Sequence, residues 1–140
     1  MRLSRITPVF VESAPDRLSE GVLYVSERYQ TALHKCCCGC GQEVVTPLTR
    51  ADWSLRKRGN SVSLHPSIGN WDFPCKSHYW IRNNEVIWAS SLSTRQIAIV
   101  RRQDKLDKQR YQQQVNRLKV ADPAPPAGVF QSIWRWLTAR

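Results

Sequence analysis

The sequence of 140 residues lacks any long apolar run. A helix that spans a bilayer needs about 20 consecutive apolar residues, and no stretch of this chain approaches that length. The N-terminal stretch MRLSRITPVFVESAPDR also lacks the apolar segment of a secretory signal. We therefore expect a cytoplasmic protein without a membrane span, and the length suits one domain with a short appendage.

Acidic residues are scarce, with 11 Asp and Glu against 21 Lys and Arg, so the formal net charge is +10. The excess is uneven, because residues 95–119 carry 8 Lys and Arg and only 2 Asp. Such a segment is typical of a solvated helix face, and it is also the kind of surface that binds a polyanion such as nucleic acid. The sequence leaves both interpretations open.

Cysteines spread along the chain, as in an extracellular disulfide framework, are also lacking. Four of the five cysteines lie in the stretch CCCGC, and Cys75 stands apart. Neighbouring cysteines do not bridge one another easily, because a disulfide requires a specific separation of its Cα atoms. The clustering therefore favours a reduced compartment and a bound metal, although buried cysteines also act as small apolar side chains.

Zinc is the natural ion for such a cluster, since it prefers four thiolate or imidazole ligands in a tetrahedron. In an extended chain, Cys36 and Cys38 would share one face. Gly39 would then let the backbone bend around Cys40, and Cys75 would complete the site from a distant segment. We expect Zn²⁺ bound by these four cysteines.

Histidines offer alternative ligand sets. In the stretch CKSH, His78 follows Cys75 at a plausible ligand spacing, and His34 precedes Cys36 by two residues. Either ring could replace one sulfur. A site with four protein ligands is closed and structural, whereas a catalytic zinc keeps one position open for water.

Short β-like runs fill the first two thirds of the chain, and two of them are typical of hairpins that turn at Gly59 and at Asn83-Asn84. This pattern predicts an α+β protein: a small antiparallel β-sheet or barrel stapled by zinc, followed by C-terminal helices. The predicted strand-forming stretches are TPVFVES, GVLYVSE, QEVVTPL, DWSLRKRGNSVSL and SHYWIRNNEVIWAS.

The strand-like stretches end before Ser93, where STRQ predicts a capping box at the start of a helix. We expect a core over residues 1–92 and a basic helix over 93–120. The stretch ADPAPPAG predicts a stiff linker over 121–128. The last segment, 129–140, has the apolar spacing of an amphipathic helix.

Ser67 is a candidate nucleophile. Pro66 precedes it and Gly69 permits a sharp turn after it, which would expose the hydroxyl and nearby amides. A serine needs a base within ~3 Å, and His78 would be held near the metal through Cys75.

Other interpretations of these residues stay open. Ser67 could simply cap its own turn, as serines in turns often do. His65 is an alternative base, since it lies two residues before Ser67 on a possible strand. His34, Asp72 and Glu85 are conceivable residues to orient the base, and none is marked by its spacing.

The motifs HKCCCGCGQ, VSLHPSIGNW, PCKSHYWI and VIWA resemble those of the BubE-type peptidases of bacterial ubiquitination-like operons, over roughly residues 20–90. The resemblance implies a protease that trims a ubiquitin-like precursor after its terminal Gly, or removes the modifier from its targets. It implies partners as well: the ubiquitin-like protein and its activating and conjugating enzymes. A role in antiphage defence follows from the same resemblance.

The resemblance also implies roles for individual residues. The family's first pattern, His-x-Cys-x-Cys-Gly-Cys-Gly, falls on His34, Cys36, Cys38 and Cys40. Its Pro-Ser falls on Pro66 and Ser67, and its Cys-x-Ser-His falls on Cys75, Ser77 and His78. Cys37 and His65 lie at positions expected to vary. Two rival functions remain from the residues alone: a zinc metalloprotease, and a non-enzymatic zinc module that binds nucleic acid or a protein through residues 95–119.

Overall fold

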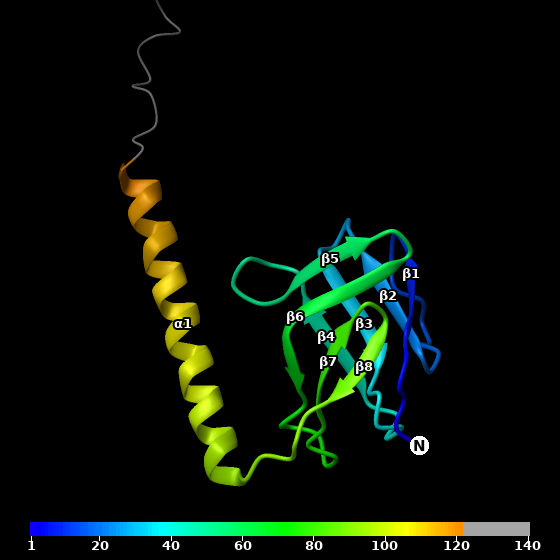
Figure 1. Ribbon diagram of the computed structural model, residues 1–140. Helices are drawn as coiled ribbons and strands as arrows, with labels where there is room; N and C mark the ends of the chain where they lie inside the picture. The colour runs from blue at the N-terminus through cyan, green and yellow to red at the C-terminus, as the bar shows by residue number, and fades with distance from the viewer. Residues whose placement is uncertain (122–140) are drawn as a thin grey trace, which may run out of the picture. The chain divides into compact units, whose positions relative to one another are not determined.

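The computed structural model describes residues 1–121, whose strands form two four-stranded sheets (Figure 1). In order, the first sheet contains β1 (Thr7–Phe10), β2 (Val22–Ser26), β3 (Thr31–Lys35) and β4 (Glu43–Pro47). The second contains β5 (Ser54–Arg58), β6 (Ser61–Gly69), β7 (His78–Arg82) and β8 (Glu85–Trp88). The helix α1 spans Thr94–Ala121. The expected α+β class is confirmed, with two sheets in place of a single sheet or barrel.

One strand pair departs from the antiparallel expectation, because β1 runs parallel to β2. The N-terminal segment first pairs with the β7–β8 hairpin: the Ile6 amide donates to Asn84 and the Val86 amide donates to Ser4. The same segment then continues as β1 beside β2, so it links the two sheets. Residues 11–21 provide the long connection that a parallel pair requires.

A single apolar core lies between the two sheets. Strands with alternating burial supply it, as expected for sheets with one solvated face. Two large side chains with polar atoms, Tyr79 of β7 and His34 of β3, are also fully buried. The apolar members that the two sheets contribute are Leu23, Val25, Ala32, Val44, Val62, Leu64, Ile68, Ile81 and Val86.

The predicted capping box begins α1. The Gln96 amide donates to the Ser93 hydroxyl, and the Ser93 amide donates to the Gln96 side chain. Ile97 is the buried residue of this helix, whose basic stretch is mostly exposed. No helix within residues 1–121 combines the length and the apolar character needed to cross a bilayer.

The chain divides into two units, Met1–Lys105 and the part from Leu106 onward, and the candidate site lies within the first. The predicted domain boundaries of 1–92 and 93–120 stay predictions. The proposed linker over 121–128 lies outside the described residues except for Ala121, the last residue of α1. The proposed terminal helix over 129–140 lies wholly outside them.

Candidate active site and cysteine cluster

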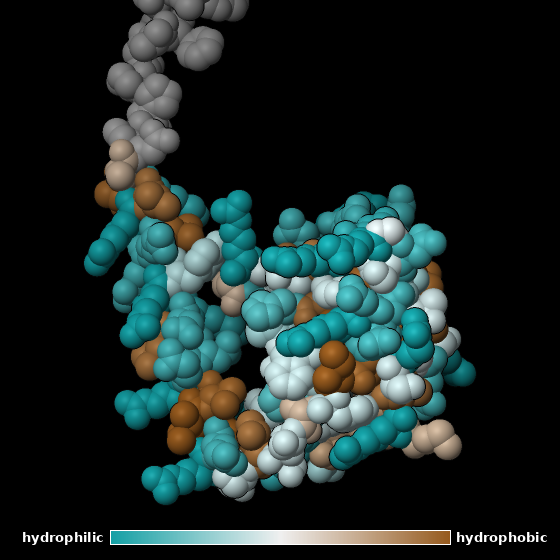
Figure 2. Space-filling model, viewed as in Figure 1, coloured by the Kyte–Doolittle hydropathy of each residue, from teal (hydrophilic) through white to brown (hydrophobic). Residues whose placement is uncertain are grey.

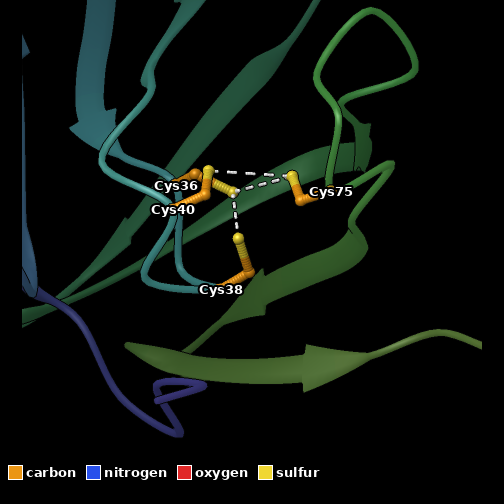
Figure 3. A group of neighbouring side chains, drawn as sticks. All are labelled: Cys36, Cys38, Cys40 and Cys75. Carbon is orange, nitrogen blue, oxygen red and sulfur yellow. Dashed lines mark hydrogen bonds between the residues drawn. The ribbon is translucent and has the colours of Figure 1, made fainter.

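Four cysteines from two remote loops point their sulfur atoms toward one another (Figure 3). The sulfurs of Cys36, Cys38, Cys40 and Cys75 all lie within 4.8 Å of one another. Cys36 is 3.4 Å from Cys38 and 3.9 Å from Cys75, and Cys40 is 3.7 Å from Cys75. The set predicted from the sequence is therefore the set that the fold gathers.

These spacings fit a tetrahedral metal site. With metal–sulfur bonds of ~2.3 Å, the edge of the tetrahedron is ~3.8 Å long, close to the observed separations. Soft thiolates are also the donors that zinc and similar ions prefer. The cluster could hold such a metal, and His34 and His78, the alternative ligands, lie outside it.

The electrostatics of the cluster also favour a cation. Burial and neighbouring sulfurs raise the pKa of Cys38, and burial raises the pKa of Cys40. Burial acts to raise the pKa of Cys75 too, but hydrogen bonds with Ser77, Cys38 and Cys40 outweigh it and hold that pKa at about 7. Cys38 and Cys40 therefore resist deprotonation on their own, and a divalent ion would supply the charge that a cluster of thiolates requires.

A tight turn gathers three of the sulfurs. The expectation of an extended chain through Cys36 and Cys38 is wrong, because β3 ends at Lys35 and the Gly39 amide donates to the Cys36 carbonyl at 3.0 Å. Gly39 and Gly41 adopt φ of 84° and 81°, which side-chain-bearing residues rarely adopt. The bend thus begins before Cys40, and it turns all three sulfurs inward.

Ser77 and Asn70 support the cluster from within the protein. The Ser77 hydroxyl lies 3.0 Å from the Cys36 sulfur and accepts from the Asn70 amide nitrogen at 2.9 Å. The Ser77 oxygen accepts from Asn70, and the hydroxyl proton of Ser77 is available to the Cys36 sulfur. Both side chains are buried. Hydrogen bonds of this kind orient metal ligands and stabilise their thiolate form.

Ser67 and His78 meet on the outer face of the second sheet. The Ser67 hydroxyl lies 2.9 Å from Nε2 of His78, which is hydrogen-bonding distance for a nucleophile and its base. Burial lowers the pKa of His78, so the ring stays neutral and able to accept a proton at neutral pH.

A bulge in β6 brings this pair together. Leu64 pairs with Ile81 and Ile68 pairs with Tyr79, so three residues of β6 face only Trp80 of β7. Such an insertion bends the strand and redirects a side chain. The predicted sharp turn at Gly69 is wrong, because Gly69 lies within β6 and pairs with His78.

A family profile described as "Bacterial ubiquitination-like system serine protease (BubE)" matches residues 10–89. That range covers more than half of the chain and contains both the cysteine cluster and the Ser67–His78 pair. The chain belongs to the BubE family. The resemblance seen in the sequence motifs is confirmed, and the reaction class is that of a serine protease of a bacterial ubiquitination-like system. No curated protein and no solved structure matches the chain.

In this BubE-family chain, two tryptophans flank the His78 ring. Trp71 contacts it edge-on at 5.0 Å between ring centroids, and Trp80 lies at 5.4 Å. The Nδ1 atom of His78 is buried and has no hydrogen-bond partner among the described residues. Gly69 makes room for Trp71, since a Cβ atom there would lie 2.3 Å from that ring.

The acidic candidates for orienting His78 are occupied elsewhere in this BubE-family fold. Asp72 forms an ion pair with Arg101 at 2.6 Å, and Glu85 forms one with Arg5 at 3.9 Å. Neither carboxylate bonds to the ring of His78.

His34 also lies away from the pair. Its Nε2 atom is 2.8 Å from the Tyr79 hydroxyl in the core, and burial lowers its pKa to about 4. Cys37 is buried beside it outside the sulfur cluster, and burial raises its pKa to about 12. His65 is exposed, and the described structure records a bond from the Ser54 hydroxyl to its carbonyl but none between its ring and Ser67.

Sequence reasoning gave no role to Asn70, Trp71, Ser77 or Trp80. Ser77 carried a signal, since it lies between Cys75 and His78 in the motif CKSH. The tryptophans carried only a weak one, because alternation along β7 places Trp80 and His78 on one face but cannot place Trp71.

Proposed function

We propose that the protein is a Ser/His peptidase that cleaves after the C-terminal Gly of a bacterial ubiquitin-like protein. Its substrate is the precursor of that protein, its conjugates, or both. The observation that carries the proposal is the 2.9 Å contact between Ser67 and His78 inside the region matched to the BubE family.

In the first step, the Ser67 oxygen attacks the carbonyl carbon of the Gly, and Nε2 of His78 takes the hydroxyl proton. The tetrahedral intermediate collapses when the same imidazolium gives that proton to the leaving amine. An ester then joins Ser67 to the modifier. Water, deprotonated by His78, hydrolyses the ester and regenerates the serine.

The oxyanion needs hydrogen-bond donors close to Ser67. Pro66 has no amide proton, so it cannot contribute one. The bulge leaves residues between Leu64 and Ile68 outside the ladder with β7, so the amide of Ser67 is the natural donor.

The aromatic rings around His78 take the place of an orienting acid. Trp71 and Trp80 restrict the ring by contact and so keep Nε2 directed at Ser67. This account is supported by the unpartnered Nδ1 atom, which no described carboxylate approaches.

The cysteine cluster would hold a structural Zn²⁺. The ion would bind Cys36, Cys38, Cys40 and Cys75, and so join the loop after β3 to the loop before β7. Four thiolates fill the tetrahedron and leave no position for a reactive water, which argues against the metalloprotease alternative. The zinc would therefore fix the segment that carries His78 and take no part in proton transfer.

The nucleic-acid alternative rests on α1, whose residues 95–119 carry most of the excess positive charge. It predicts binding to DNA or RNA that weakens steeply with salt. The family match does not cover this helix, so the peptidase is the better supported function.

The test uses the ubiquitin-like protein that is encoded beside this protein, with a reporter fused after its terminal Gly. The measured quantity is the rate at which the reporter is cleaved off. We expect Ser67→Ala and His78→Ala to retain the fold and lose at least about a thousandfold in kcat/KM. Ser91→Ala is the matched control, because Ser91 is exposed and lies outside the site. Normal cleavage by Ser67→Ala would rule out the proposed nucleophile.

A further inference from the structure

A basic hollow lies on the outer face of β5, β6 and β7. Its volume is about 610 Å³, and it is open to solvent. Over β5 and β6, Figure 2 shows mostly hydrophilic residues. The residues that border the hollow through their side chains or their backbone come from β5, β6 and the β7–β8 hairpin: Ser54, Arg56, Lys57, Arg58, Ser63, Leu64, His65, Arg82 and Asn83.

The hollow lies on the same sheet face as the Ser67–His78 pair. Along β7 the buried residues are Tyr79 and Ile81, so His78 and Arg82 point to the opposite, outer side. Along β6, Val62 and Leu64 point inward. Arg82 is four residues from His78 on the regular strand β7, which places that end of the hollow about 13 Å from the base, or about four residues of extended peptide.

The charge in the hollow is of one sign. Arg56, Arg58 and Arg82 border it from the outer face, and its lining contains no carboxylate. No ion pair within residues 1–121 involves Arg56, Lys57, Arg58 or Arg82. Arg82 lies over the Trp80 ring, which orders this cation without neutralising it, whereas Lys57 lies over Phe10 of the first sheet. A concave surface of uncompensated positive charge attracts and orients an anionic ligand.

We propose that this hollow binds acidic residues that lie N-terminal to the scissile Gly in the ubiquitin-like substrate. The inference rests on the proposed function, because it requires an extended substrate that reaches from the hollow to Ser67. Residues before the terminal Gly belong to the modifier itself. The hollow would therefore recognise the precursor and every conjugate alike.

An acidic peptide fits the hollow better than nucleic acid does. Proteins that bind single-stranded nucleic acid combine a positive groove with aromatic platforms for the bases. The lining of this hollow contains no Phe, Tyr or Trp side chain. The arginines instead supply forked donors that suit carboxylates.

The test uses two fluorogenic peptides that end in Gly-Gly-aminomethylcoumarin. One has three acidic residues before the glycines, and the other has their uncharged amide counterparts. We expect the wild-type protein to show a KM about tenfold lower for the acidic peptide, with similar kcat. Arg56→Glu should abolish this preference and leave turnover of the uncharged peptide unchanged. Arg17→Glu, an exposed charge reversal outside the hollow, is the matched control.

Binding to Ser67→Ala, measured by fluorescence anisotropy, separates the two proposals. Binding of the acidic peptide that weakens with salt and is lost in Arg56→Glu would support the hollow. If such binding occurs and neither peptide is cleaved, only the proposed function fails. Equal cleavage and equal binding of the two peptides would overturn the inference and leave the peptidase intact. Preferential binding of a single-stranded oligonucleotide, lost in Arg56→Glu, would also overturn it.

Discussion

At the scale of single residues, the account depends on the protonation of His78. The ring is enclosed by Trp71 and Trp80, and burial lowers its pKa below the ordinary value of 6.5. A histidine acts as a general base only when its ring is neutral. A lowered pKa therefore extends activity toward acid, because the ring loses its proton at a lower pH than a solvated histidine.

We predict that kcat/KM for a Gly-Gly peptide rises with pH and reaches its plateau below about pH 7. The midpoint should lie below 6.5, the ordinary pKa of a histidine. A pH–rate profile over a range in which circular dichroism shows the fold intact measures it. A midpoint above 6.5 would contradict the idea that a desolvated His78 is the base.

Gly69 offers a second test at this scale. A methyl group there would lie 2.3 Å from the Trp71 ring, so Gly69→Ala must displace that ring from His78. Since small misplacements of catalytic groups are costly, we predict about a hundredfold loss in kcat with little change in KM. Trp71→Phe, which keeps an aromatic contact, should lose only about tenfold. Equal activity of Gly69→Ala and wild type would show that Trp71 does not position the base.

At the scale of elements, two loops and one bulge make the site. The loop after β3 and the loop before β7 bring the four sulfurs together, and the bulge in β6 aims Ser67 at His78. Ser77 belongs to both arrangements, because it contacts Cys36 and immediately precedes His78.

We predict that Ser77→Ala weakens metal binding by about 10- to 100-fold, because the Cys36 thiolate loses a hydrogen-bond donor. Competition with a zinc chelator measures the affinity.

Cys40→Ser should lower the metal content below one ion per chain, and Cys37→Ala should leave it at one, since Cys37 lies outside the cluster. Loss of metal in Cys37→Ala but not in Cys40→Ser would contradict the proposed ligand set.

Local pattern was enough to predict several elements but not their assembly. Strand-forming residues in SHYWIR marked β7, and turn-forming Asn83 and Asn84 marked its hairpin, because these signals act within a few residues. The bulge before Ile68 and the parallel pairing of β1 depend on contacts between remote segments, so no local pattern contains them. Physical reasoning from the residues named Ser67 and His78 only as one alternative among several, and the family motifs then favoured this pair.

At the scale of the whole molecule, the protein is a small two-sheet domain whose site depends on a cross-link between loops. A core of this size gives limited stability, and bound zinc would add to it directly. A metal bound at the cysteine cluster would therefore affect the stability of the entire fold.

We predict that a chelator lowers the melting temperature and that activity is lost only as the protein unfolds. Parallel measurements of peptide cleavage and circular dichroism during chelation test this. If activity vanished while the fold and melting temperature stayed unchanged, the metal would have a catalytic role and the structural assignment would be wrong.

The central claim is that the oxygen of Ser67 forms a covalent bond with the substrate acyl group. The most direct measurement is mass spectrometry of the folded protein after reaction with a fluorophosphonate probe, with the modified residue located by peptide sequencing. The account predicts one adduct, on Ser67, which is absent in Ser67→Ala and strongly slowed in His78→Ala. An adduct on another residue, or no adduct in a protein that still cleaves its substrate, would contradict it.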